Sequence, residues 1–82
     1  MKIDQNIIEE ILEILTSLIE DIPSKARIQL KIIIENLNDD SLNLEKLLII
    51  RDDLDLFSGN SGIDSYTRNQ IYNVLSLFET LF

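Results

Sequence analysis

The chain has 82 residues and a formal net charge of −8, from 15 acidic and 7 basic side chains, and it contains neither cysteine nor histidine. This composition excludes disulfides, thiolate and histidine catalysis, and the commonest transition-metal ligands. Because the basic residues are dispersed, the acidic surface should repel phosphates, so direct nucleic-acid binding is not expected. We expect a cytoplasmic protein that is not an enzyme and carries no cofactor or metal.

Isoleucine and leucine supply 29 of the 82 residues, whereas aromatic residues number only five. We expect one domain spanning residues 1–82, near the size at which a single core barely offsets the entropy of ordering the chain. Association with a second copy is the natural way to supplement the stability of such a small core. Neither a targeting segment nor a membrane-spanning apolar run is evident, so no membrane contact is expected.

Four helices are predicted, because apolar residues recur every three or four positions in four segments of the chain. In chain order these helices cover residues 4–20, 23–37, 43–57 and 64–81. The expected N-caps are Asp4, Asn43 or Ser41, and Asp64, and Pro23 suits the first turn of the second helix. A polar cluster at 38–41 and a glycine loop at 58–62 separate the later helices.

Two stretches, IPSKAR and IDSYTR, carry an isoleucine, a serine and an arginine at identical spacing, 41 residues apart. The same shift aligns apolar positions along the second and fourth helices, whereas the first and third helices match at only two pairs. These pairs are Ile7 with Leu48 and Ile8 with Ile49. We predict an all-α, four-helix up-and-down antiparallel bundle built from two repeated helical hairpins, at about 4–38 and 42–82.

Arg27 and Arg68 are the repeated basic residues of these stretches. In a structural interpretation, each guanidinium reaches a carboxylate at the preceding helix end or loop, such as Glu20, Asp21 or Asp64. In a functional interpretation, the pseudo-symmetry brings both guanidiniums to one end of the bundle as a fork for an anionic partner. The sequence leaves both interpretations open.

One segment, TRNQIYNVLSLFE at 67–79, combines a Thr-Arg step with an Ile-aromatic-Asn, a serine and a glutamate. The residues concerned are Thr67, Arg68, Ile71, Tyr72, Asn73, Ser76 and Glu79. Pro23 and Arg27 form an earlier Pro-x-x-x-Arg motif, and Asp52, Asp53 and Leu54 form a leucine-aspartate stretch. These features resemble uncharacterised protein family 0147, a group of small archaeal proteins, with departures at Asp64 and Tyr72 that are typical of a divergent member. The resemblance implies a four-helix up-and-down bundle in an archaeal cytoplasmic protein, and it implies no activity.

Acidic residues are the only candidates for metal or acid–base chemistry, and they are densest just before the glycine loop. With Asp53 as the first position of a calcium loop, Asp55 falls third and Asp64 twelfth, but Phe57 takes a ligand position and Ser58 the place of the required glycine. We therefore interpret these carboxylates as a solvated helix face. A small hydrolase or isomerase is a third hypothesis, and it would need a pocket with convergent carboxylates.

Two apolar runs, 32–34 and 47–50, are too continuous for one helix face, because successive residues turn by about 100° around a helix. They either wrap a tight four-helix core or are partly exposed as a homodimer or partner surface. Tyr66 and Tyr72 lie on different sides of the fourth helix, and one of them is expected in the core.

The leading hypothesis is a non-catalytic protein–protein interaction module that binds itself, as a homodimer, or a partner protein through exposed Ile/Leu rows. The alternative is an accessory factor of an RNA- or ribosome-associated machine that docks through two arginines. The candidate partner-binding residues are Arg27, Arg68, Ile32, Ile34, Ile49, Ile50 and Tyr72. No catalytic, cofactor-binding or metal-ligating residue is predicted.

Overall fold

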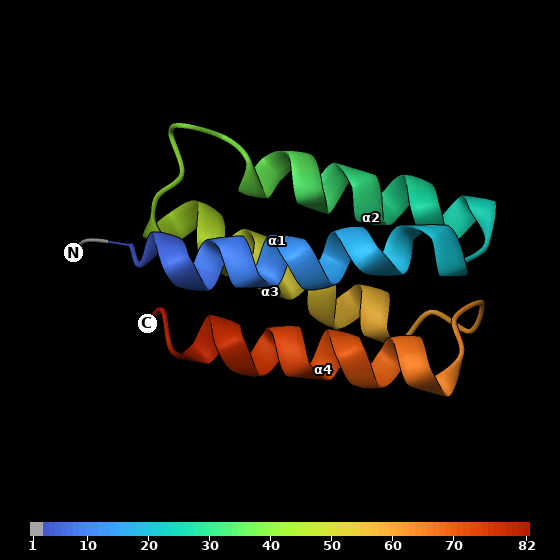
Figure 1. Ribbon diagram of the computed structural model, residues 1–82. Coiled ribbons are helices and arrows are strands. Elements are labelled where there is room, and N and C mark those ends of the chain that lie inside the picture. The colour runs from blue at the N-terminus through green and yellow to red at the C-terminus, as the bar shows by residue number, and fades with distance from the viewer. Residues whose placement is uncertain (1–2) are drawn as a thin grey trace.

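The computed structural model describes residues 3–82, which form four α-helices (Figure 1). The helices are α1 (Gln5–Leu18), α2 (Ser24–Leu37), α3 (Leu44–Ser58) and α4 (Ser65–Glu79), and a one-turn 3-10 helix, η1 (Ile19–Asp21), continues α1. No strand occurs in this part of the chain, which confirms the all-α prediction. None of these helices is both long and apolar enough to cross a bilayer.

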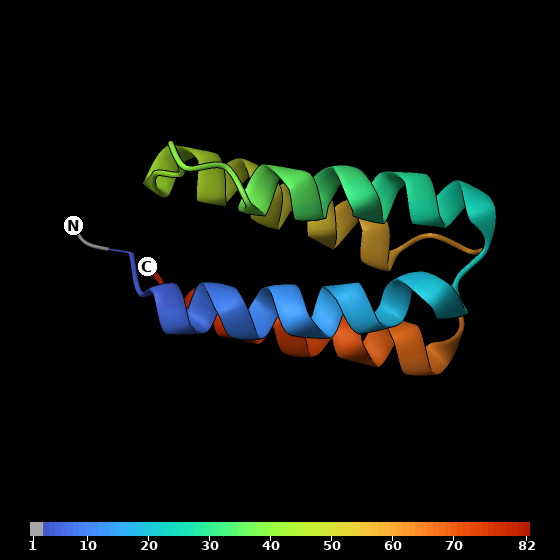
Figure 2. The ribbon, with the colours of Figure 1, turned by 45° about the horizontal axis from the view of Figure 1, so that its top comes forward.

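The helices run alternately up and down, so both ends of the described chain lie at the same end of the bundle (Figure 1). Helix α1 packs against α2 and α4, and α3 packs against the same two helices, whereas the diagonal pairs make at most marginal contact. Figure 2 shows the result as two layers, one formed by α1 and α4 and the other by α2 and α3. The predicted up-and-down bundle is therefore confirmed, with extents of 36 × 20 × 19 Å.

Polar side chains begin three of the four helices, as the sequence predicts. The Asp4 and Asn43 side chains each accept a hydrogen bond from a backbone N–H of the first turn at 2.9 Å, and that of Asp64 accepts one at 2.7 Å. These bonds satisfy N–H groups that have no partner within the helix. Pro23 stands immediately before α2, at a position where its missing N–H costs nothing.

The core consists of one apolar stripe from each helix, and the two hairpins bury equivalent residues. Helices α2 and α4 match with the predicted shift of 41 residues, but α1 and α3 match with a shift of 39. The buried α1/α3 pairs are Ile8 with Leu47, Ile11 with Ile50, Leu15 with Leu54, and Leu18 with Phe57. The predicted pairings of Ile7 with Leu48 and of Ile8 with Ile49 are therefore wrong, because the α3–α4 connection is two residues longer than the α1–α2 connection.

Candidate interaction surface

Arg27 and Arg68 lie at equivalent positions in the first turn of α2 and α4, and both guanidiniums bind backbone carbonyl groups. Arg27 donates from Nε to Ile19 O at 3.0 Å and from Nη2 to Ile22 O at 3.3 Å, and Arg68 donates from Nε to Ser58 O at 2.8 Å and from Nη2 to Asn60 O at 3.2 Å. The Nε acceptors, Ile19 and Ser58, are themselves related by the 39-residue shift. Each arginine therefore joins the start of a return helix to the end of the preceding helix, where exposed carbonyls favour a cation.

This geometry corrects the structural interpretation of the two arginines. Neither guanidinium forms an ion pair with a carboxylate in the described part of the chain, and the partners are carbonyl oxygens instead. Both side chains are half-buried, and both lie at the end of the bundle that holds the α1–α2 and α3–α4 connections (Figure 1). Their hydrogen bonds already hold Nε and Nη2, so these atoms are not free to form a fork for an anion.

The predicted apolar rows divide between core and surface. Ile32 and Ile49 are exposed, at 53% and 57%, whereas Ile50 is 3% exposed and belongs to the core. Ile34 is half-buried against the core. The expectation that all four residues contribute to a binding surface is therefore wrong for Ile50, because that residue falls on the buried stripe of α3.

Both tyrosines of α4 are exposed, so the expectation that one would enter the core is wrong. Tyr72 also lies apart from Ile32 and Ile34, because α4 and α2 form a diagonal pair that makes at most marginal contact. Two exposed residues were missed by the sequence reasoning: Ile28, and Leu56, which at 78% is the most exposed large apolar side chain of the described chain. A signal existed, since Leu56 follows Ile49 by seven residues and so continues the same side of α3.

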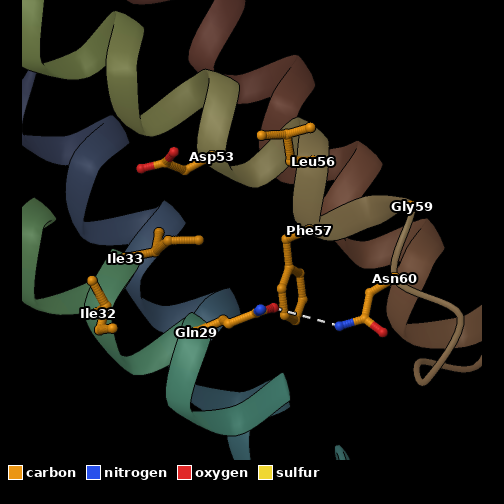
Figure 3. Close-up of a pocket in the computed structure, with 8 residues that line it drawn as sticks. All are labelled: Gln29, Ile32, Ile33, Asp53, Leu56, Phe57, Gly59 and Asn60. Atoms are coloured by element: carbon orange, nitrogen blue, oxygen red, sulfur yellow. Dashed lines mark hydrogen bonds between the residues drawn. The ribbon is translucent and has the colours of Figure 1, made fainter. Parts of the chain in front are cut away.

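A groove lies between α2 and α3 next to the α3–α4 connection (Figure 3). Its volume is about 450 Å³, and it is lined by Gln29, Ile32 and Ile33 of α2 and by Asp53, Leu56, Phe57, Gly59 and Asn60. Asn60 Nδ2 donates to Gln29 Oε1 at 3.5 Å across one end. A smaller hollow of about 200 Å³ continues along the same two helices at Asn36, Lys46 and Ile49. We refer to Ile28, Gln29, Ile32, Asn36, Lys46, Ile49, Asp53 and Leu56 as the α2/α3 face.

The repeat provides an internal control for this face, because equivalent helices meet the same packing demands. Four large apolar residues of α3 are exposed, and the shift of 39 places each of them on an exposed polar residue of α1. The pairs are Leu44 with Gln5, Leu48 with Glu9, Ile49 with Glu10, and Leu56 with Ser17. The bundle therefore accepts polar residues at these positions, and apolar residues there are not required by the fold.

The same holds for α2 and α4. Ile28 and Ile32 are exposed, and the shift of 41 places them on Asn69 and Asn73, which are exposed on α4. In total, the described chain exposes six large aliphatic residues on α2 and α3 and none on α1. Exposed aliphatic surface is thus concentrated in the α2/α3 layer.

One difference between the layers helps to leave the groove open. Ile14 of α1 packs against the core beside α4, whereas its equivalent in α3 is Asp53, which is exposed. A charged side chain stays in water rather than filling the space between α2 and α3. The groove over Ile33 and Phe57 is therefore open in Figure 3.

Two carboxylates of the described chain have shifted pKa values, and both lie in connections between helices. The backbone N–H and the hydroxyl of Ser41, followed by Lys46, lower the pKa of Asp39 to about 2. Thr67 holds the pKa of Asp64 below its usual value, and the contact responsible is the hydrogen bond that the Thr67 backbone N–H donates to the carboxylate at 2.7 Å, since the buried Thr67 hydroxyl has no partner. These shifts belong to helix starts and turns, and neither carboxylate lines the groove.

Acidic side chains do not converge on a site. Within residues 3–82, no group of three or more carboxylates is close enough to hold a metal ion. Asp53 and Asp55 stand on the continuous helix α3 rather than in a loop, which agrees with their interpretation as a solvated helix face.

Comparison with protein-family models, with curated proteins and with solved structures found no match for this chain. The resemblance to uncharacterised protein family 0147 therefore stays a hypothesis, and the function has to be argued from the α2/α3 face.

Proposed function

We propose that this chain is a non-catalytic protein–protein interaction module that binds through the α2/α3 face, either to a second copy or to another protein. The observation that carries the proposal is the internal control: exposed isoleucine and leucine occupy α2 and α3 where the equivalent helices have exposed polar residues. Clustered exposed aliphatic residues beside a groove are typical of protein interfaces. Apolar burial on binding would supply the free energy of association.

The alternative, docking to RNA through Arg27 and Arg68, has less support. Both guanidiniums are half-buried, and each donates two hydrogen bonds to carbonyl groups of its own chain. An anion would have to compete with these bonds, and the net charge of −8 opposes its approach. We therefore retain the α2/α3 face as the candidate binding surface.

The repeat supplies variants that test this function with little risk to the fold. A face variant takes residues from the equivalent helices: Ile28→Asn, Ile32→Asn, Ile49→Glu and Leu56→Ser. A control variant applies the same logic to α4, with Tyr66→Lys and Tyr72→Lys, since the α2 equivalents are Lys25 and Lys31. Both variants should keep the circular dichroism of the wild-type protein.

Each form is used as tagged bait in an extract of the source cell, and recovered proteins, including untagged copies of this chain, are quantified by mass spectrometry. We expect a protein that is recovered by the wild type and the control variant and lost, by at least tenfold, with the face variant. Equal recovery by all three baits would contradict the proposal.

A further inference from the structure

We propose that the occupant of the α2/α3 face is a second copy of this chain, packed about a twofold axis so that Leu56 of each copy enters the groove of the other. This inference rests on the proposed function, because it needs the α2/α3 face to be a binding surface. Three properties of the face favour a second copy over an unrelated partner: its shape, its area and its charge.

The first property is shape. A twofold interface uses the same patch twice, so that patch must carry both a projection and a hollow that accepts it. Leu56 is the most exposed large apolar side chain of the described chain and stands at the rim of the groove of about 450 Å³ (Figure 3). Ile33 and Phe57 provide an apolar floor beneath it. The α2/α3 face therefore carries both the projection and the hollow that a twofold interface needs.

The second property is area. One long side of a bundle that measures 36 × 20 × 19 Å offers roughly 700 Å², and a standard protein interface buries about 800 Å² per partner. The side formed by α2 and α3 is thus large enough for a dimer of this small chain. It also carries four of the exposed large apolar residues, Ile28, Ile32, Ile49 and Leu56, which would form the centre of the interface.

The third property is charge, which decides whether two chains of net charge −8 can meet. Residues 3–22 carry six acidic side chains and no basic one, whereas residues 23–58 carry five basic and seven acidic ones. The repulsive charge therefore lies mostly on α1, in the layer away from the α2/α3 face (Figure 2). On the face itself Lys46 and Asp53 provide both signs, and Lys46 is already paired with Asp39 of its own chain at 3.2 Å, so the face carries little net charge to repel a second copy.

Sedimentation equilibrium over about 1 to 500 μM tests self-association. We expect the wild type and the Tyr66→Lys/Tyr72→Lys control to dimerise. The dissociation constant should rise at least 100-fold in the face variant and at least tenfold with Leu56→Ser alone. Each substitution has this large an effect because it occurs in both copies and so twice in the interface. A wild type that is monomeric throughout, or a dimer whose dissociation constant is unchanged in both variants, would overturn the inference.

Cross-linking tests the geometry with single substitutions, at a protein concentration at which Leu56→Cys still dimerises. Because the sequence has no cysteine, Leu56→Cys and Gln29→Cys each introduce a unique thiol. A short bismaleimide should join a mixture of these two variants into a covalent heterodimer at least ten times faster than a mixture of Leu56→Cys with Thr16→Cys on α1. Equal rates in the two mixtures would contradict the proposed packing.

The two proposals fail in different ways. A monomeric wild type whose bait still recovers another protein through the α2/α3 face would remove the second copy and keep the proposed function. A face variant that recovers the same proteins as the wild type would remove the proposed function as well.

Discussion

Helices α1 and α3 bury equivalent residues and show opposite outer surfaces. Each contributes four apolar side chains at the same spacing to one core, but α1 is acidic and polar outside, whereas α3 exposes leucine and isoleucine. Since the packing demands are matched, the difference cannot be a requirement of the bundle. An internal repeat thus separates the residues that specify a fold from those that are available for function.

The largest expected effect concerns the shared core. Leu15→Ala and Leu54→Ala each remove a fully buried side chain at equivalent positions, so each should lower the free energy of unfolding by about 3 kcal/mol. Urea denaturation of the two variants measures this. A loss that is confined to one of them would break the equivalence of α1 and α3.

The next effect concerns the two hairpin connections. Arg27→Ala and Arg68→Ala each remove a pair of hydrogen bonds from a charged donor to backbone carbonyls, and each should lower the free energy of unfolding by about 2 kcal/mol. Lysine at either position should recover less than half of the loss, because one ammonium group cannot match the planar fork of a guanidinium. Full recovery by lysine would show that charge alone is needed.

Asp53→Ile makes the α2/α3 layer resemble the α1/α4 layer, in which Ile14 holds the equivalent place. By filling part of the groove beside the buried Phe57, the substitution should raise the free energy of unfolding by about 1 kcal/mol. It should also weaken any association that uses the groove. The matched control is Asp52→Ile on the solvent side of α3, for which we expect no stabilisation in the same denaturation experiment.

The smallest effect is acid sensitivity, and it distinguishes the two connections. Asp64 begins α4 with a lowered pKa, whereas Pro23 holds the equivalent place before α2 and cannot titrate. Because the folded-state pKa lies below the unfolded value, the carboxylate stabilises the fold fully above the ordinary aspartate pKa of 3.8 and loses this contribution as the pH falls below it. Asp39, with a pKa of about 2, should behave alike down to that pH.

Thermal unfolding between pH 6 and 2 measures this acid dependence. We expect a shallower loss of stability on acidification in Asp64→Asn and in Asp39→Asn than in the wild type. An identical pH profile for the wild type and Asp64→Asn would show that the cap is not sensitive to protonation.

The fold could be predicted from the sequence because its causes are local. Apolar spacing, the caps at Asp4, Asn43 and Asp64, and the repeated arginine define four helices and two hairpins. The register of α3 could not be predicted from the shift of 41 residues that relates α2 to α4. The α3–α4 connection has two extra residues, so a second shift, of 39, relates α1 to α3. A correct shift would have placed Ile50 in the core.

The candidate site was predicted only in part. Continuous apolar runs indicate more apolar residues than one core face can bury, but they do not say which residue of a run faces water. The exposed Ile32 and Ile49 were therefore predicted as surface residues together with Ile50, which is buried. The carbonyl partners of Arg27 and Arg68 were missed because backbone acceptors leave no mark in a sequence. The groove could not be predicted because it depends on how α2 packs against α3, where the side chain of Asp53 leaves space between the two helices.

Hydrogen–deuterium exchange is the most direct test of whether the α2/α3 face is the binding surface, because it maps burial along the chain without substitutions. Amide exchange is compared between dilute and concentrated protein, and in the presence of any protein that the wild-type bait recovers. We expect added protection in α2 and α3 and none in α1. Added protection centred on α1, or equal exchange in every condition, would contradict the assignment of the α2/α3 face as the binding surface.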